Sequence, residues 1–295
     1  MITPPLSRRL FVTALAAVAS PMPGLALPLE DDFADVEAKL GGRLGVWAGS
    51  VRTDAALGHR QDERFAMASS FKWLLAAAVL ERVDQGRERL DRTVAYAKSD
   101  LIGHSPVTAA HLAEGHLPVS ALAEAAVTQS DNGAANLLLE SVGGPAALTA
   151  FLRRHGDGVT RLDRNEPELN TAIPGDPRDT TTPRAMAGNL RRLLFGNALT
   201  PASRDRLRGW LIANRTGDAR IRAGLPAGLT VGDKTGTGER GAIGDVGFVL
   251  APTPGRTHPL IVAVYLQAPS ATPDAREAAI ARCASIVWRR LAMAA

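Results

Sequence analysis

Two hydrophobic patterns occur along this chain, and their order leaves few possible architectures. Runs rich in small and β-branched residues, which are typical of strands, lie near both ends, at 42–52, 229–238, 242–251 and 258–268. Between them apolar residues recur every three to four positions, which is typical of helices. We therefore expect an antiparallel sheet formed by both chain ends, with flanking helices and an all-helical lobe inserted after the first strand.

The helical pattern can be divided into separate elements by its start and stop signals. Thr182-Pro183 and Thr200-Pro201 each place Thr at an N-cap and Pro at the first helical position. The segment 161–181 contains three prolines and no stable period, so it is expected to be a long loop. The helices are predicted at 69–84, 119–129, 133–141, 145–155, 183–195, 201–213 and 273–293.

The expected fold class is α/β, an α+β sandwich in one domain at 27–295. The α/β lobe should comprise about 27–62 and 214–295, and the helical lobe about 63–213. Residues 1–26 are expected to be an export signal, because a basic start is followed by an apolar stretch and a small residue, Ala26.

The signal contains the run Ser-Arg-Arg-Leu-Phe-Val at 7–12, which resembles a twin-arginine signal. An ordinary secretory signal that contains two arginines is the alternative. Either signal predicts export, and we expect a periplasmic protein that is not held at the membrane. Removal of Arg8 and Arg9 leaves 32 basic against 30 acidic residues, and only 4% of residues are aromatic. Nucleic acid is therefore not expected as a partner. We also expect a monomer.

The single cysteine and the histidines point to no metal or disulfide. Cys283 has no partner for an intramolecular disulfide and lies in an apolar helical pattern, so a buried thiol is expected. His111 and His116 are five residues apart, which does not place them on one helical face. We therefore expect no metal site.

Ser69 and Lys72 are three residues apart at the start of the first predicted helix. Such residues share one face, with their Cβ atoms roughly 5–6 Å apart. A lysine whose pKa is lowered by burial can take the proton of a hydroxyl and so make it a nucleophile. A Ser-x-x-Lys run is nevertheless expected about once by chance in a chain of this length. A surface lysine beside an N-cap serine would explain it as well.

Two further motifs lie at the expected edges of a cleft. Ser130-Asp131-Asn132 begins a predicted helix, and a simple N-cap is the alternative interpretation. Lys234-Thr235-Gly236 lies in a predicted strand, and a turn with a solvated lysine is its alternative. As an edge strand, its backbone could pair with an amide substrate while Lys234 and Thr235 bind a carboxylate.

The three motifs in this order resemble those of class A serine β-lactamases and penicillin-binding proteins, and the resemblance covers about 30–292. It implies hydrolysis of penicillins, and also of cephalosporins, through a serine acyl-enzyme, which gives antibiotic resistance. It implies a small-molecule β-lactam substrate and no cofactor, with the active site between the two lobes.

The run Glu166-Pro167-Glu168-Leu169-Asn170 separates the activities that share these motifs. By resemblance, Glu166 is the base for deacylation, Asn170 holds the catalytic water, and Arg164 pairs with Asp179 to pin the loop ends. A D,D-peptidase, which would keep a stable acyl-enzyme, and a non-hydrolytic sensor remain the alternatives. Solvated loop charges are the alternative interpretation of the run itself.

The resemblance also implies the remaining roles. Backbone N–H groups of Ser69 and Thr237 would form the oxyanion hole. Lys72 would take the proton of Ser69, although Glu166 acting through water is the other candidate base. Ser130 would pass a proton to the departing ring nitrogen. The residues implied in substrate binding are Asn132, Asn170, His104, Lys234, Thr235, Gly236, Thr237 and Arg220.

Four positions depart from common members of the family. Ile243 stands where many have an arginine, and Arg220 in a Thr-Gly-x-x-Arg context is expected to reach the same carboxylate. His104 stands where the cleft wall usually has an aromatic residue. Ala68 and Gly238 are not cysteines, so the disulfide of some carbapenem-hydrolysing relatives is not possible.

Overall fold

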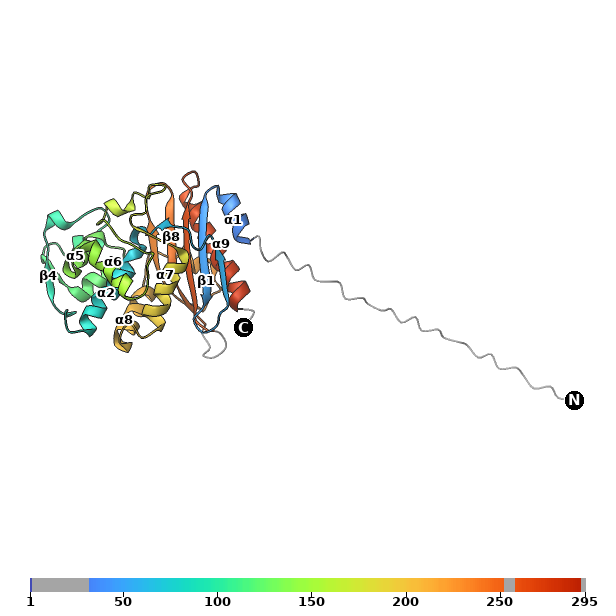
Figure 1. The fold of residues 1–295 in the computed structure, drawn as a ribbon, viewed down its shortest axis with the longest axis horizontal. Helices are drawn as coiled ribbons and strands as arrows, with labels where there is room; N and C mark the ends of the chain where they lie inside the picture. The colour runs from blue at the N-terminus through green and yellow to red at the C-terminus, as the bar shows by residue number, and fades with distance from the viewer. Residues whose placement is uncertain (2–31, 252–257, 293–295) are drawn as a thin grey trace.

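A five-stranded antiparallel sheet lies at the centre of the fold, in the order β2-β1-β9-β8-β7 (Figure 1). The structure is a computed structural model that describes residues 1, 32–251 and 258–292, so the predicted signal lies outside the described residues except for Met1. Both chain ends contribute to the sheet, as predicted. The strands are β1 Arg43–Ser50, β2 Ala56–His59, β7 Thr230–Thr237, β8 Ala242–Leu250 and β9 Leu260–Gln267.

Both faces of this sheet are covered, which explains why β8 and β9 are buried along almost their whole length. Helices α1 Asp32–Leu40 and α9 Pro273–Val287 pack on one face. Helix α7 Pro183–Leu190 packs on the other, where the helical lobe begins. Two hydrophobic cores result, one on each side of the sheet.

The helical lobe surrounds α2 Lys72–Asp84, whose first ten residues are all buried. A helix that is apolar on every side belongs at the centre of a lobe. The lobe also contains two short strand pairs that the sequence did not predict, β3 Phe65–Ala66 with β6 Thr180–Thr181 and β4 Thr93–Ala95 with β5 His116–Pro118. The other helices of the lobe are α3 Pro106–Ala110, α4 Val119–Thr128, α5 Asn132–Val142, α6 Gly144–Arg154 and α8 Pro201–Ile212.

The predicted caps are confirmed. Thr182 Oγ1 accepts a hydrogen bond from Ala185 N at 3.1 Å, and Thr200 Oγ1 accepts one from Ser203 N at 3.3 Å. The Cys283 thiol is fully buried in α9, and burial raises its pKa to about 12, so it stays protonated and packs as an apolar group.

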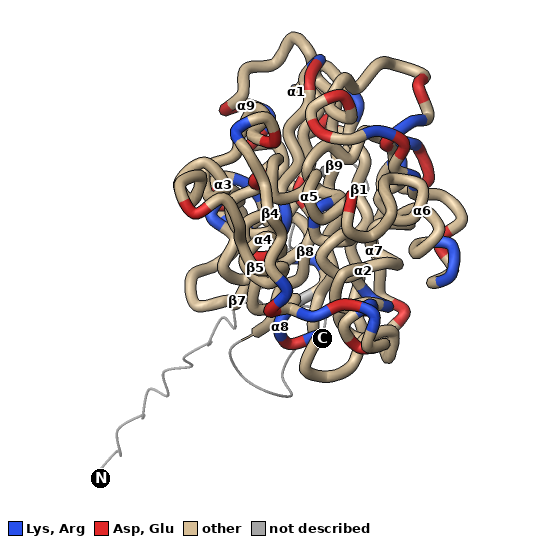
Figure 2. The backbone as a smooth tube through the Cα atoms, turned by 90° about the vertical axis from the view of Figure 1, so that its left-hand side faces the viewer, with Lys and Arg blue, Asp and Glu red and all other residues tan. Residues whose placement is uncertain are grey.

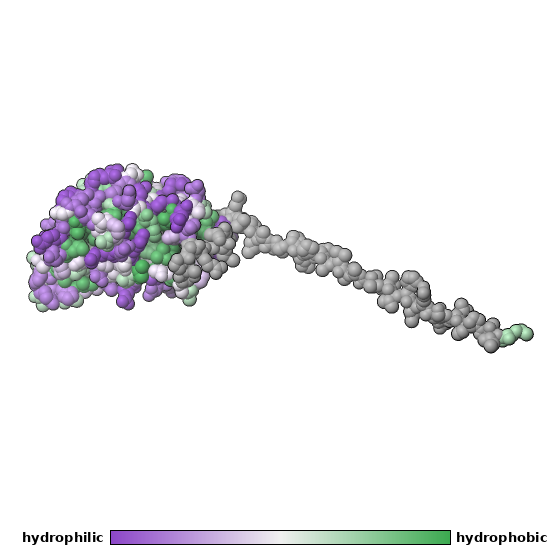
Figure 3. All heavy atoms as spheres, turned by 90° about the horizontal axis from the view of Figure 1, so that it is seen from below, coloured by the Kyte–Doolittle hydropathy of each residue, from purple (hydrophilic) through white to green (hydrophobic). Residues whose placement is uncertain are grey.

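Basic and acidic residues are interspersed along the chain, and Figure 2 shows backbone positions of Lys and Arg beside those of Asp and Glu in that view. The face in Figure 3 is largely hydrophilic, with hydrophobic residues in small groups between. Within the described ranges, no single helix is long and apolar enough to cross a membrane. One bent pair of helices, Asn132–Val142 with Gly144–Arg154, meets this requirement by length and composition alone.

Candidate active site

The candidate nucleophile, Ser69, lies in a 3₁₀ turn at Ala68–Phe71 that leads directly into α2. The α-helix itself begins three residues later than predicted, because Ala68 adopts a left-handed backbone conformation (φ 43°) that redirects the chain. The turn is tied down where Met67 N donates to the Asp179 carbonyl at 3.0 Å. Strand β7 passes so close that a Cβ atom at Gly236 would collide with the Met67 carbonyl oxygen, so only glycine fits there.

Lys72 projects from the first turn of α2 into a cluster of oxygens. Its Nζ lies 3.0 Å from Ser69 Oγ, 2.8 Å from the Ser130 carbonyl, 2.5 Å from Asn132 Oδ1 and 3.0 Å from Glu166 Oε1. The side chain is fully buried, and loss of solvation lowers its pKa against the opposing pull of the Glu166 carboxylate. A neutral amine at this position could accept the proton of Ser69.

Glu166 contacts the same hydroxyl and also the Lys72 amine. Its Oε1 accepts a hydrogen bond from Ser69 Oγ at 3.1 Å, and its Oε2 accepts one from Asn170 Nδ2 at 2.5 Å. Only 2% of the residue is exposed, and its peptide bond to Pro167 is cis. The carboxylate, the amine and the hydroxyl therefore form a closed triangle of contacts.

Asn136 holds Glu166 in this position, and the sequence did not reveal it. Asn136 Oδ1 accepts from Glu166 N at 3.0 Å, while its Nδ2 donates to the Glu166 carbonyl at 2.9 Å. The available signal was its spacing: Asn136 lies four residues after Asn132 on α5 and so faces the same side of the helix.

Ser130 lies between two lysines. Its Oγ accepts from Lys234 Nζ at 3.1 Å and lies 3.4 Å from Lys72 Nζ, and its backbone is left-handed (φ 57°). Lys234 Nζ also donates to the Thr235 carbonyl at 2.8 Å. Full burial, and then the charge of Lys72, lower the pKa of Lys234 to about 7.

Asp131, between Ser130 and Asn132, is the N-cap of α5, as one interpretation of the motif predicted. Its carboxylate accepts from Ala134 N at 2.8 Å and from the backbone N–H groups of Val107 and Thr108 at 2.8 and 2.9 Å. The motif loop is thereby fixed to α3.

Arg220 lies beneath the edge strand instead of projecting freely into the cleft. Its guanidinium donates to Thr237 Oγ1 at 2.8 Å and to the carbonyls of Gly236 and Gly244 at 3.0 and 2.9 Å. Its Nε pairs with Glu277 at 3.2 Å, and the residue is 6% exposed. Arg220 can therefore act on a substrate through Thr237 and through its charge.

Thr216 is a second residue that the sequence did not single out, although it begins the Thr-Gly-x-x-Arg run. Its hydroxyl lies 2.5 Å from Thr235 Oγ1 and donates to Asn214 Oδ1 at 2.8 Å. It therefore orients the hydroxyl of Thr235 on the edge strand.

The ends of the segment 164–179, called here the Ω loop, are brought together. Arg164 Nε donates to Asp179 Oδ2 at 2.6 Å, and the carboxylate also accepts from the backbone N–H groups of Asp163 and Arg164 at 2.7 and 3.0 Å. Asp179 is 1% exposed. A further bond of 2.8 Å, from Glu239 N to the Asn170 carbonyl, ties the loop to the turn after β7.

His104 lies in the loop before α3 with an exposed ring. The ring Nε2 is 2.9 Å from the Gln129 carbonyl, and the His104 carbonyl accepts from Asn132 N at 2.8 Å. Ile243 is buried in β8 within the core beneath α9. Residues 32–251 and 258–292 contain no cluster of three His, Cys, Asp or Glu side chains that could hold a metal ion.

The Ser69 hydroxyl contacts both a buried amine and a carboxylate, and a second lysine, Lys234, lies beside them on the edge strand. This arrangement is that of a serine hydrolase that works through an acyl-enzyme. The chain belongs to the β-lactamase enzyme family, whose model matches residues 28–291. Solved structures place it with class A, so the resemblance seen in the sequence is confirmed.

Three of these solved structures illustrate the similarity. A reconstructed class A β-lactamase of the last common ancestor of Gram-negative bacteria is 59% identical, with a TM-score of 0.85 over 88% of this chain and 98% of that one. Another ancestral class A β-lactamase is 57% identical, with a TM-score of 0.85 over 88% and 99%. The third is PenP from Rhodopseudomonas palustris, a protein assigned to the class A β-lactamases. It is 54% identical, with a TM-score of 0.84 over 88% of this chain and 98% of that one. The chain described here therefore hydrolyses β-lactams, and this activity gives antibiotic resistance.

Proposed function

We propose that Ser69 is the nucleophile and Lys72 its base. Ser69 Oγ bonds to the β-lactam carbonyl carbon while its proton passes to neutral Lys72, 3.0 Å away. The lowered pKa of Lys72 supports this role, because a buried amine loses its proton more readily. The N–H groups of Ser69 and Thr237 hold the oxyanion.

Ser130 completes ring opening. The carbon–nitrogen bond breaks, and the proton reaches the departing nitrogen through the Ser130 hydroxyl, which lies within 3.4 Å of Lys72 Nζ. Lys234 at 3.1 Å fixes the position of that hydroxyl. The same lysine, with Thr235, Thr237 and the charge of Arg220 behind them, binds the substrate carboxylate. Asn132 binds the side-chain amide, and His104 forms the facing wall.

Deacylation uses Glu166 and Asn170. Asn170 Oδ1 is buried, and no group in the described part of the chain donates to it. A buried acceptor of this kind normally binds water. A water that donates to Asn170 Oδ1 and to Glu166 would lie beside the acyl ester, where Glu166 takes its proton as the water oxygen bonds to the acyl carbon. The ester bond to Ser69 Oγ then breaks, and the proton held by Glu166 returns to Ser69 Oγ.

The observation that carries this proposal is the triangle of Ser69 Oγ, Lys72 Nζ and Glu166 Oε1, with sides of 3.0, 3.0 and 3.1 Å. We propose penicillins and cephalosporins as substrates and a monomeric enzyme. The run Ser-Arg-Arg-Leu-Phe-Val supports export to the periplasm by the twin-arginine route.

The test is to mix the purified protein with a chromogenic cephalosporin and count turnovers per molecule. Many turnovers are expected, and Ser69→Ala should abolish them while Ser99→Ala, at an exposed serine, leaves them unchanged. A single burst with a stable adduct would instead support a D,D-peptidase or a sensor.

A further inference from the structure

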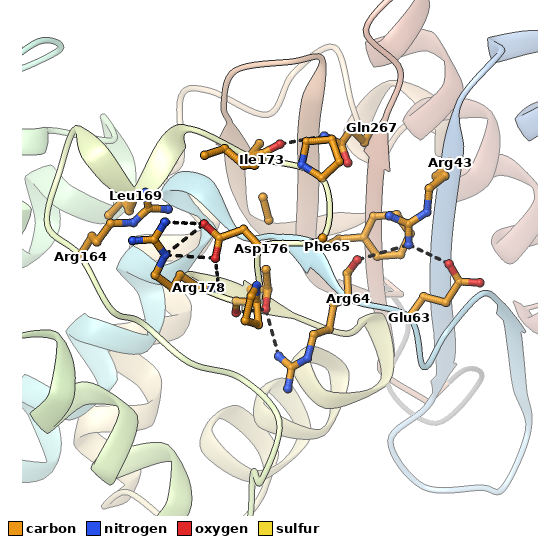
Figure 4. A pocket seen from close by; sticks show the side chains of 16 residues that line it. Arg43, Glu63, Arg64, Phe65, Arg164, Leu169, Ile173, Asp176, Arg178 and Gln267 are labelled. Carbon is orange, nitrogen blue, oxygen red and sulfur yellow. Dashed lines mark hydrogen bonds and ion pairs between the residues drawn. The ribbon is translucent and has the colours of Figure 1, made fainter.

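A separate cavity of about 310 Å³ lies against the Ω loop. Its walls come from the loop, from β3 and the turn before it, and from the ends of β1 and β9 (Figure 4). Among the described residues that line it, only Arg164 was given a role above, and none belongs to the triangle around Ser69. Its volume is at the lower end of the range for ligand pockets, about 300–1,000 Å³, and suits a small molecule.

One wall of the cavity is apolar. Phe65, Leu169 and Ile173 line it together with Pro174. Ile173 is 44% exposed, one of few large hydrophobic side chains in the described ranges that remain open to solvent. The apolar wall as a whole, with Ile173 open at one side, suits a ligand with an apolar body.

The charges around the cavity do not cancel. Four arginines line it, against two carboxylates. Arg43 pairs with Glu63 at 2.7 Å, and Arg178 pairs with Asp176 at 2.7 Å. Arg164 pairs with Asp179, as described above.

Arg64 is the fourth arginine and the exception. Its Nη1 donates to the Val159 carbonyl and to Thr180 Oγ1, both at 3.0 Å, and both oxygens are neutral. Its Nε and Nη2 have no partner in the described part of the chain. The same is true of the two Nη atoms of Arg164, because the guanidinium of that residue bonds to Asp179 only through Nε. The cavity therefore offers guanidinium N–H groups and one positive charge that no carboxylate neutralises.

We propose that this cavity binds a small organic monoanion with a flat apolar body. Its carboxylate bonds to Arg64, and its body lies against Ile173 and Pro174. The binding does not depend on the catalytic roles proposed above.

Occupancy of the cavity stabilises the Ω loop in the conformation described here. Leu169 and Ala172 line the cavity and lie on either side of Asn170, and Gln267 Nε2 donates to the Ala172 carbonyl at 2.9 Å. A ligand that contacts both residues favours the conformation to which it binds, in which Glu166 touches Ser69.

The test uses 2-naphthoate as the probe and its neutral isostere 2-naphthamide as the comparison. Titration calorimetry on the whole protein should give a dissociation constant of about 1 mM for the anion, as expected for a ligand of this size. Arg64→Gln should weaken binding about tenfold, and Arg64→Lys should retain most of it. Arg89→Gln, at an exposed arginine outside the cavity, is the matched control and should bind as the unaltered protein does.

Two further readouts locate the probe and its effect. A crystal soaked with 2-naphthoate should place the carboxylate at Arg64, and hydrogen exchange of the Ω-loop amides should slow by at least about threefold at saturation. The proposal is overturned if the probe lies only in the catalytic cleft against Lys234, if the amide binds equally well, or if Arg64→Gln binds unchanged. Unchanged hydrogen exchange in the loaded protein would overturn the stabilisation of the loop. None of these readouts requires turnover, so a failure of the proposed catalytic roles would be seen separately.

Discussion

Asn136 binds Glu166 by both backbone polar groups, with its amide oxygen 3.0 Å from the Glu166 N–H and its amide nitrogen 2.9 Å from the Glu166 carbonyl. A single side chain on α5 thus fixes the backbone position of Glu166, the loop residue that carries the carboxylate. The position of Glu166, the proposed deacylation base, is therefore set by helix α5 as well as by the Ω loop.

Asn136→Ala should slow deacylation more than acylation. It leaves two backbone groups of Glu166 without partners, which costs about 2 kcal/mol and corresponds to about a thirtyfold slower step. Stopped-flow measurement of both steps with a chromogenic cephalosporin checks this. Asn165→Ala, at the exposed residue beside Glu166, serves as control. Equal rates in the Asn136 variant and the unaltered protein would show that the loop does not need this clamp.

Arg164→Ala should lower stability, because it removes the partner of a carboxylate that is 1% exposed. The two backbone N–H groups that remain on Asp179 limit the loss to about 2 kcal/mol, or a fall in Tm of about 4–8 °C. Arg89→Ala is the matched control, since both side chains of its pair with Asp91 are exposed and its loss should change Tm undetectably. A calorimetric scan that gave both variants the same Tm would contradict the pinning role of Arg164.

Lys234 should make substrate binding depend on pH. Full burial is the main cause that lowers its pKa to about 7, so the free enzyme loses this cation as pH rises above 7. KM for a penicillin should therefore rise above pH 7, with kcat affected less, and Lys234→Arg should remove the dependence because a guanidinium stays charged. A KM that stays constant between about pH 6 and 9 would refute it.

The same shift has a consequence for stability. The folded pKa of Lys234 lies below its ordinary value of 10.5, so the unfolded chain binds the extra proton between about 7 and 10.5. The contribution of this residue to the free energy of unfolding should therefore become more favourable as pH rises through that window.

The sequence predicted the long elements because their periods extend over eight or more residues. β7, β8 and β9 and the helices that begin at Thr182-Pro183 and Thr200-Pro201 carry strong patterns or caps. β2 and the two short strand pairs in the helical lobe have two to four residues per strand, which is too few for any period to show.

The sequence predicted those residues of the candidate site that belong to a short motif. Ser69, Ser130 and Lys234 meet because three motifs converge, and these motifs could be read locally. Asn136 and Thr216 bind groups 30 and 19 residues away, so their contacts arise only from the tertiary fold. The exact start of α2 also escaped prediction, because it depends on the left-handed conformation of Ala68, a residue type that rarely adopts it.

The carboxylate of Glu166 is the group whose removal tests these roles most directly. Glu166→Ala, mixed with a chromogenic cephalosporin, should give one burst of product per molecule and then stop, with an acyl adduct on Ser69 visible by mass spectrometry. Continued turnover at the rate of the unaltered enzyme would contradict Glu166 as the deacylation base. Complete loss of the burst would contradict Lys72 as the group that takes the proton of Ser69.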